Sequence, residues 1–365
     1  MKKIYLLFLA LISLFFVACD SNNDTDGDWA KSLEFAGGNR VCAVSFTDPE
    51  TGDVFIGMGL NSTLSSVADQ NVRDFWKYNG SSWTKVTDFP AEGRYGSVAF
   101  VIDGIAYIGA GFRGAYADQP DDKYYSDFYM YDIKKNEWLS EENEEGETEY
   151  KTIDIQDFEP NHDDCAFSNG IAFTQDGKGY VGTGKLKDRV SKTIYCFDPK
   201  TGKWSDAAFP GDSRTAAVTF TIDNKTVICL GSNGTENRTD VIVFENGQWS
   251  IKEPLADRNG KWNDDYNKIP RSHAIAFTAV DGNRTYGYIA GGTGNNTCWE
   301  YNIVKDRWDE VTKFPVRMSM RLGAVGFSYG NYGYITTGGT SPTNSTDNST
   351  WVFIPGIDED DNNDY

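Results

Sequence analysis

The sequence predicts an all-β fold, a β-propeller of six four-stranded blades. A glycine mark recurs six times at a period of roughly 50 residues, a spacing typical of radial arrays with one sheet per repeat. The marks lie at 57–59, 109–111, 182–184, 231–232, 291–292 and 338–339. Aromatic residues make up 14% of the chain and it holds 37 glycines, which suits strands joined by many turns. No long stretch shows helical periodicity.

The first strand of each unit is expected to end on a phenylalanine. These residues are Phe46, Phe100, Phe173, Phe220, Phe277 and Phe327. Six residues earlier, five of the six units carry an arginine and the third carries Phe167. The arginines are Arg40, Arg94, Arg214, Arg271 and Arg321. A turn such as Asp103-Gly104 then leads into the second strand, because Asp-Gly pairs supply the positive φ that tight hairpins need.

The third strand of each unit is rich in aromatic residues, and the fourth opens on a tryptophan in five units. The sixth unit has no fourth strand of its own after Pro355. The spacing from Trp29 to Phe35 matches that from Trp83 to Phe89. We therefore expect residues 28–35 to pair beside residues 351–353 and close the ring, which removes an exposed sheet edge.

The order of arginine, glycine pair, tyrosine or phenylalanine, and tryptophan resembles the kelch repeat. The resemblance covers residues 29–355, nearly the whole of the expected mature chain. It implies a kelch-type propeller, in agreement with the strand pattern. It leaves the function open, because kelch propellers serve as scaffolds, glycan binders and enzymes.

The first residues predict export and lipidation. Residues 1–18 are typical of a signal peptide, and Phe16-Val17-Ala18-Cys19 resembles a bacterial lipobox, which implies Cys19 as the lipidated N-terminus. An ordinary, removed signal peptide is the alternative. Residues 19–27 are expected to be a flexible acidic tether, 28–355 the propeller and 356–365 an acidic tail. The expected location is the bacterial cell envelope, as an outer-membrane lipoprotein that is periplasmic or surface-exposed.

Charge and residue types exclude several classes of function. The net charge of −20 argues against nucleic acid and against anionic membrane surfaces, so the lipid alone is expected to contact the membrane. Five cysteines remain after Cys19, and most are expected to be small buried core residues. No CxxC spacing, Walker loop, GxSxG elbow or HExxH stretch occurs, and there are two histidines. We therefore expect no metal and no cofactor.

Long segments are predicted to gather on one face, which carries the second-to-third loops and the links between blades. That face should hold the five repeat arginines, either as backbone-bonding structural residues or as a ring that grips an anion. The 112–126 loop adds Arg113 and Tyr124, and the 256–270 link adds Trp262. These aromatics suit sugar stacking or protein contact, or they pack beneath their own loops.

Two classes of function fit these residues. The first is a non-enzymatic module that binds a glycan or protein ligand, which could be acidic, through the long-loop face. The second is a sugar mutarotase, since N-acetylneuraminate epimerase is similar in having six kelch blades and an exported location. Galactose oxidase is a more distant resemblance. It implies a copper site, which the two histidines of this chain do not support. A buried carboxylate or histidine facing the arginines would favour the mutarotase, and no catalytic base is nominated.

Overall fold

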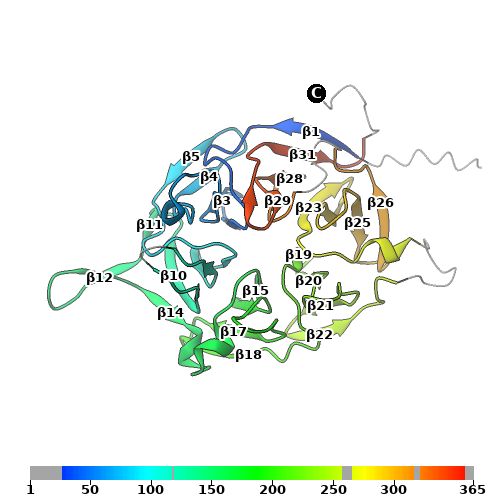
Figure 1. Ribbon diagram of the computed structural model, residues 1–365. Helices are drawn as coiled ribbons and strands as arrows, with labels where there is room; N and C mark the ends of the chain where they lie inside the picture. The colour runs from blue at the N-terminus through cyan, green and yellow to red at the C-terminus, as the bar shows by residue number, and fades with distance from the viewer. Residues whose placement is uncertain (1–26, 117–118, 257–264, 316–320, 358–365) are drawn as a thin grey trace, which may run out of the picture.

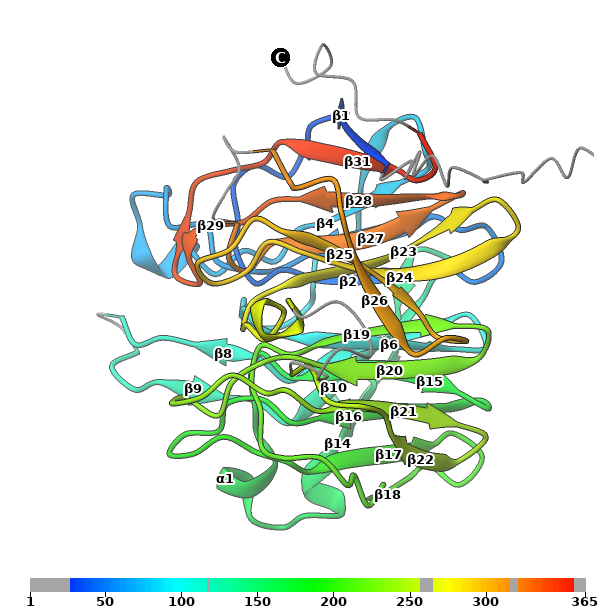
Figure 2. The same ribbon diagram turned by 90° about the vertical axis from the view of Figure 1, so that its right-hand side faces the viewer.

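The computed structural model describes residues 27–116, 119–256, 265–315 and 321–357, and confirms a six-bladed β-propeller. Six antiparallel sheets stand around a central axis, seen along that axis in Figure 1 and from the side in Figure 2. The described residues contain no helix long and apolar enough to cross a membrane.

The blades follow one another in chain order, and each runs outward from its first strand. Blade 1 contains β2 (Val44–Thr47), β3 (Val54–Gly57), β4 (Phe75–Tyr78) and β5 (Trp83–Val86). Blade 2 contains β6 (Val98–Ile102), β7 (Ile105–Gly109), β10 (Asp127–Asp132) and β11 (Glu137–Trp138), with β14 (Thr152–Asp154) also paired to β10. Blade 3 contains β15 (Ile171–Gln175), β16 (Lys178–Gly182), β17 (Ile194–Asp198) and β18 (Lys203–Asp206).

The second half of the ring repeats this plan. Blade 4 contains β19 (Val218–Ile222), β20 (Lys225–Cys229), β21 (Val241–Glu245) and β22 (Gln248–Ile251). Blade 5 contains β23 (Ile275–Asp281), β24 (Arg284–Ala290), β25 (Cys298–Asn302) and β26 (Arg307–Val311). Blade 6 contains β27 (Val325–Tyr329), β28 (Tyr332–Thr336), β31 (Thr350–Ile354) and β1 (Asp28–Ser32).

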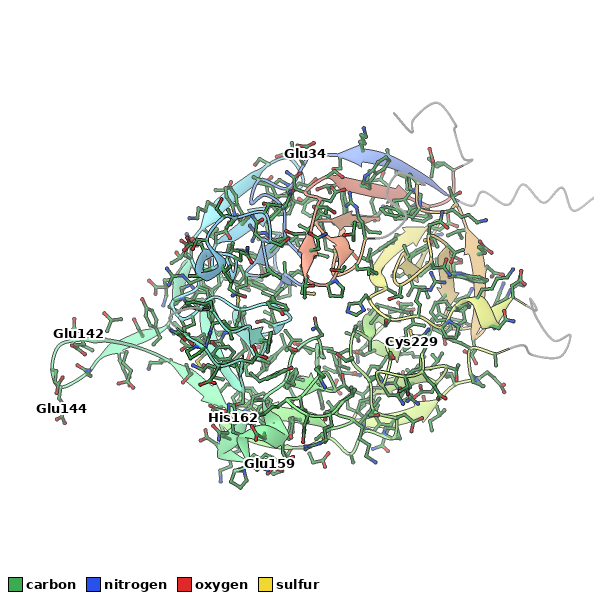
Figure 3. The ribbon with its side chains drawn as sticks, viewed as in Figure 1. Glu34, Glu142, Glu144, Glu159, His162 and Cys229 are labelled. Carbon is green, nitrogen blue, oxygen red and sulfur yellow. The ribbon has the colours of Figure 1, made fainter. Side chains whose placement is uncertain are left out.

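Short elements decorate the blades. Three two-stranded ribbons are β8 (Phe112–Arg113) with β9 (Lys123–Tyr124), β12 (Ser140–Glu142) with β13 (Thr148–Tyr150), and β29 (Gly339–Ser341) with β30 (Asn344–Ser345). The helical turns are η1 (Val67–Asp69), η2 (Ile155–Asp157), α1 (His162–Cys165) and η3 (Tyr266–Lys268). The β12–β13 ribbon is exposed throughout and projects from the rim, with Glu142 and Glu144 near its tip (Figure 3). The glutamates of residues 141–149 therefore lie on a solvated hairpin, which is the usual place for a run of like charges.

Strand β1 closes the ring as predicted. It pairs antiparallel with β31 over five residues, from Asp28 opposite Ile354 to Ser32 opposite Thr350. The Trp29 side chain is 1% exposed, and its indole nitrogen donates a hydrogen bond of 3.1 Å to the Thr312 carbonyl of blade 5. The N-terminal strand therefore ties blade 6 to its neighbour through both main chain and side chain.

The core lies between the blades and is largely aromatic. In five blades the phenylalanine of the first strand stacks on an aromatic ring of the second, as Phe100 does on Tyr107 at a centroid distance of 4.8 Å and an interplanar angle of 6°. All five cysteines that the structure describes are buried free thiols, which confirms their prediction as core residues.

The glycine marks have two separate physical causes. A Cβ on Gly109 would lie 2.0 Å from the Asp127 carbonyl oxygen, because the third strand crosses directly over this position. Gly111, two residues later, has φ +102° and donates its amide to the Phe167 carbonyl of the next blade at 2.7 Å. The first glycine is required by close approach and the second by its left-handed backbone.

Candidate functional site

The five repeat arginines lie inside the blades, each no more than 2% exposed. Arg40 donates to the Met58 carbonyl at 3.2 Å and pairs with Asp74 at 3.0 Å. Arg94 repeats this arrangement with the Ala110 carbonyl at 3.4 Å and Asp127 at 2.5 Å. Arg214 pairs with Asp240 in the same way, whereas Arg321 donates to Ser349 at the equivalent position and pairs with Asp347 two residues earlier. Each guanidinium thus joins the glycine turn of its blade to the start of the third strand.

The two exceptions support this structural role. Arg271 has Thr297 at the position of the aspartate and donates to its hydroxyl at 2.8 Å, with further bonds to main-chain carbonyls. Blade 3 replaces both members, with Phe167 for the arginine and Thr193 for the aspartate. Blade 5 thus keeps the arginine with a hydroxyl partner, and blade 3 changes both members. These contacts favour the structural alternative over an anion-gripping ring.

On the long-loop face, main chain and small side chains surround the mouth of the central channel. The lining of its cavity of about 150 Å³ includes the residues two positions after each repeat arginine and, in blade 3, two positions after Phe167. They are Cys42, Gly96, Asn169, Ala216, His273 and Gly323, all with left-handed φ between 50° and 65°. Five consecutive amide-to-carbonyl bonds of 2.7–3.1 Å link them from blade to blade. Burial lowers the pKa of His273, so this imidazole is mostly neutral at pH 7.

The other end of the channel is neutral. A cavity of about 590 Å³ lies between the six first strands, with no charged side chain among its described lining residues. Its polar groups are the hydroxyls of Ser45, Thr47, Thr174, Thr219, Thr221, Thr278 and Ser328. Several of these bond neighbouring strands, as Thr174 does to the Val101 carbonyl at 2.8 Å. This end of the channel supplies no titratable group for acid–base chemistry.

A polar cavity lies off the axis, on the long-loop face at blades 1 and 2. This blade 1–2 groove has a volume of about 580 Å³. Its walls are the 61–74 loop after β3, the 88–93 link to β6 and the loop after β8, with Gly37 and Arg40 contributing from the approach to β2. Side chains facing it include Asn61, Asn71, Asp69, Glu92, Arg113, Tyr116 and Gln119.

Glu92 is held as an ionised carboxylate on the groove wall. It accepts hydrogen bonds from Lys123 at 2.9 Å and from the Tyr125 hydroxyl at 2.7 Å. The bond from Lys123 is the main reason that the pKa of Glu92 falls to about 2. Burial and the bond to Glu92 raise the pKa of Tyr125 well above its ordinary value. A carboxylate this acidic is a weak proton acceptor near pH 7, so this pair suits binding better than proton transfer.

Arg113 and Arg40 are the predicted site residues that line this groove, and Arg113 comes from its loops. It is 5% exposed and donates to the carbonyls of Gly114 at 3.3 Å and Asp121 at 3.4 Å. Its guanidinium carbon lies 5.2 Å from the centre of the Tyr116 ring. Its Nε atom is buried without a hydrogen-bond partner, as are Asn71 Oδ1 and Asp74 Oδ1 of the same groove.

The remaining predicted residues lie elsewhere. Tyr124 is half-buried on β9, where its ring packs 4.7 Å from Phe112, which favours packing within its own hairpin. Trp262 and Cys19 lie outside the described residues. Sequence reasoning missed Asn71 and Glu92, which belong to irregular loops. It also missed the arginine partners, for which the aspartate before the third strand in Asp74-Phe75 and Asp127-Phe128 was an available signal.

Comparisons with known proteins support the fold alone. No family model matches the chain, and no curated protein matches its sequence. Among solved structures, the chain is similar to that described as the structure of YjhT, with a TM-score of 0.60 and 16% sequence identity. The match covers 89% of this chain and 99% of that one. At this level of identity the shared feature is the propeller architecture.

Proposed function

We propose that the protein is a non-enzymatic carbohydrate-binding module and that the blade 1–2 groove is its binding site. One observation carries the proposal: a groove of about 580 Å³ combines unpaired polar atoms on Asn71, Asp74 and Arg113 with the ring of Tyr116. Cavities that hold small ligands are typically of this size. Carboxylates, amides and guanidinium forks offer paired donors and acceptors to vicinal hydroxyls, and an aromatic ring can cover a sugar face.

The wider context of this proposal follows from the sequence. Kelch-type repeats, a signal peptide and a lipid on Cys19 would hold the propeller at the outer membrane by a short tether. The long-loop face would then be presented to extracellular or periplasmic glycans. Rigid blades with irregular loops suit this task, because binding residues concentrate on loops positioned by a fixed scaffold.

The electrostatics of the groove support binding over mutarotation. A mutarotase needs a group that can both take up and release a proton beside the sugar. Glu92 has a pKa of about 2, and the aspartates facing four of the repeat arginines are engaged in ion pairs with them. Exchange spectroscopy on N-acetylneuraminate tests the alternative, since faster interconversion of its anomers in the presence of the protein would establish the enzyme.

A glycan array followed by calorimetry tests the binding proposal. The purified propeller is expected to bind glycans on the array, and Tyr116→Ala is expected to weaken binding about three- to tenfold through loss of ring contact. Tyr332→Ala is the matched control, because Tyr332 is an exposed aromatic at the start of β28, on the opposite, short-turn face. Absence of binding across the array, or full binding by Tyr116→Ala, would overturn the proposal.

A further inference from the structure

We infer that the glycan bound in the blade 1–2 groove is anionic and that its carboxylate or sulfate neutralises Arg113. This inference rests on the proposed function and specifies the class of ligand. It starts from the charge state of one buried side chain. Arg113 forms no ion pair with any residue that the structure describes, although 95% of its surface is removed from solvent.

The other buried arginines show how unusual this is. Arg40, Arg94, Arg214 and Arg321 each have a carboxylate partner. Arg271 lacks one but makes five hydrogen bonds to main-chain and hydroxyl oxygens through its outer nitrogens and Nε.

Arg113 makes two such bonds to main-chain carbonyls, both longer than 3.2 Å, and a further one to the Tyr125 hydroxyl, while its Nε has no partner among the described residues. A buried cation with so few acceptors is unfavourable unless a counter-charge arrives.

Three of the four carboxylates that line the groove already form ion pairs with a lysine or an arginine. Asp74 pairs with Arg40, Asp88 with Lys85 and Glu92 with Lys123. The lining also holds Arg73, an exposed residue whose recorded bond goes to a main-chain carbonyl at 3.5 Å, and Asp69, an exposed carboxylate. After these pairings, Arg113 and Arg73 are the cations of the lining without a carboxylate partner among the described residues, and Asp69 is the lining carboxylate that remains, on a protein whose net charge is −20.

The Tyr116 ring accounts for part of the stabilisation of Arg113 and also marks where the ligand would lie. A guanidinium 5.2 Å from a ring centre gains a modest cation–π attraction, smaller than that of an ion pair. A sugar stacked on the same ring would bring an acidic substituent within reach of the guanidinium edge. The planar fork of arginine matches the oxygens of a carboxylate or a sulfate.

Matched glycan pairs provide the test. A hyaluronan hexasaccharide and its carboxyl-reduced derivative test for recognition of a carboxylate. A keratan sulfate tetrasaccharide and its desulfated form test for recognition of a sulfate. The two pairs are measured within a wider array of acidic and neutral glycans. The wild-type protein is expected to bind acidic members at least about tenfold more tightly than their neutral partners. This comparison needs no variant and is independent of any effect on folding.

Variants then locate the effect. Arg113→Gln is expected to lower affinity for the acidic glycan to that for its neutral partner, whereas Arg284→Gln removes the same charge from the start of β24 on the short-turn face and should have no effect. Equal binding of acidic and neutral partners, or unchanged acidic binding by a folded Arg113→Gln protein, would overturn the inference and leave the glycan-binding proposal standing. An array without any bound glycan would overturn both.

Discussion

Replacing Arg214 by phenylalanine tests whether the repeat arginines are structural. Arg214 is fully buried, pairs with Asp240 and donates to the carbonyls of Asp212 at 3.1 Å and Leu230 at 3.4 Å. Blade 3 carries Phe167 at the equivalent position, so a phenylalanine ring fits this place in a blade. The substitution therefore removes the charge and its hydrogen bonds without a large change in buried volume.

The expected loss of stability follows from the Asp240 carboxylate, which the substitution leaves without its ion-pair partner. Breaking a buried ion pair typically costs 3–5 kcal/mol, because one charge is left without its partner. The Asp240 side chain is 24% exposed, so water compensates part of this cost and we expect a loss of about 2–3 kcal/mol. Adding Asp240→Thr reproduces the pairing of Phe167 with Thr193 in blade 3 and should restore about 1–2 kcal/mol, because no unpaired carboxylate remains.

Urea unfolding of the two single variants, the double variant and the wild type completes this cycle. Tryptophan fluorescence and circular dichroism should give coincident transitions, which is the condition for comparing free energies of unfolding. Arg284→Gln serves as the exposed control and should change stability by less than about 0.5 kcal/mol. A double variant no more stable than Arg214→Phe, or a single variant equal to wild type, would refute the structural assignment.

Three further predictions concern the ring, the groove and the thiols. Trp29→Ala should lower the free energy of unfolding, measured in urea, by about 3–5 kcal/mol, because a fully buried indole and its hydrogen bond to blade 5 are lost. A loss below about 1 kcal/mol would contradict closure of the ring by β1. The pKa of Glu92 is lowered from 4.5 to about 2, so its contribution to stability is complete above pH 4.5 and disappears as pH falls towards 2. Glu92→Gln should therefore flatten the acid limb of a stability–pH curve, and an unchanged limb would count against the Lys123 contact. Burial raises the pKa of Cys229 to about 12, so Ellman's reagent should modify this thiol only after unfolding, and labelling of the native protein at Cys229 would be inconsistent with its burial.

The fold could be predicted from sequence because each blade repeats the same physical requirements. The stacked pair of Phe100 and Tyr107, the crowding at Gly109 and the left-handed turn at Gly111 recur around the ring, so the units of one chain support one another's assignment. Ring closure was predictable for the same reason, since the Trp29-to-Phe35 spacing has a counterpart in complete blades.

The position of the arginines within the blades was harder to predict. Sequence placed them at the start of every first strand, close to the channel, and left open whether they face the channel or the blade. The answer depends on a second residue about 26–34 positions later, such as Asp74 for Arg40, and on which main-chain carbonyls turn inward. In four blades those carbonyls belong to a left-handed residue within or just before the glycine mark, namely Met58, Ala110, Leu230 and Gly291, a conformation visible only in three dimensions.

The residues that repeat from blade to blade and the residues that form the candidate binding groove follow different patterns in this chain. A residue that recurs in most blades serves a need that those blades share, and the five repeat arginines and the four aspartates paired with them meet that description. The blade 1–2 groove is instead formed where two long loops depart from the pattern, and Arg113 has no equivalent among the repeat positions. Its buried charge, without a carboxylate partner among the residues that the structure describes, is the kind of local conflict that folding alone does not favour. The residues that break the repeat, rather than those that define it, are therefore where recognition of a ligand is best sought.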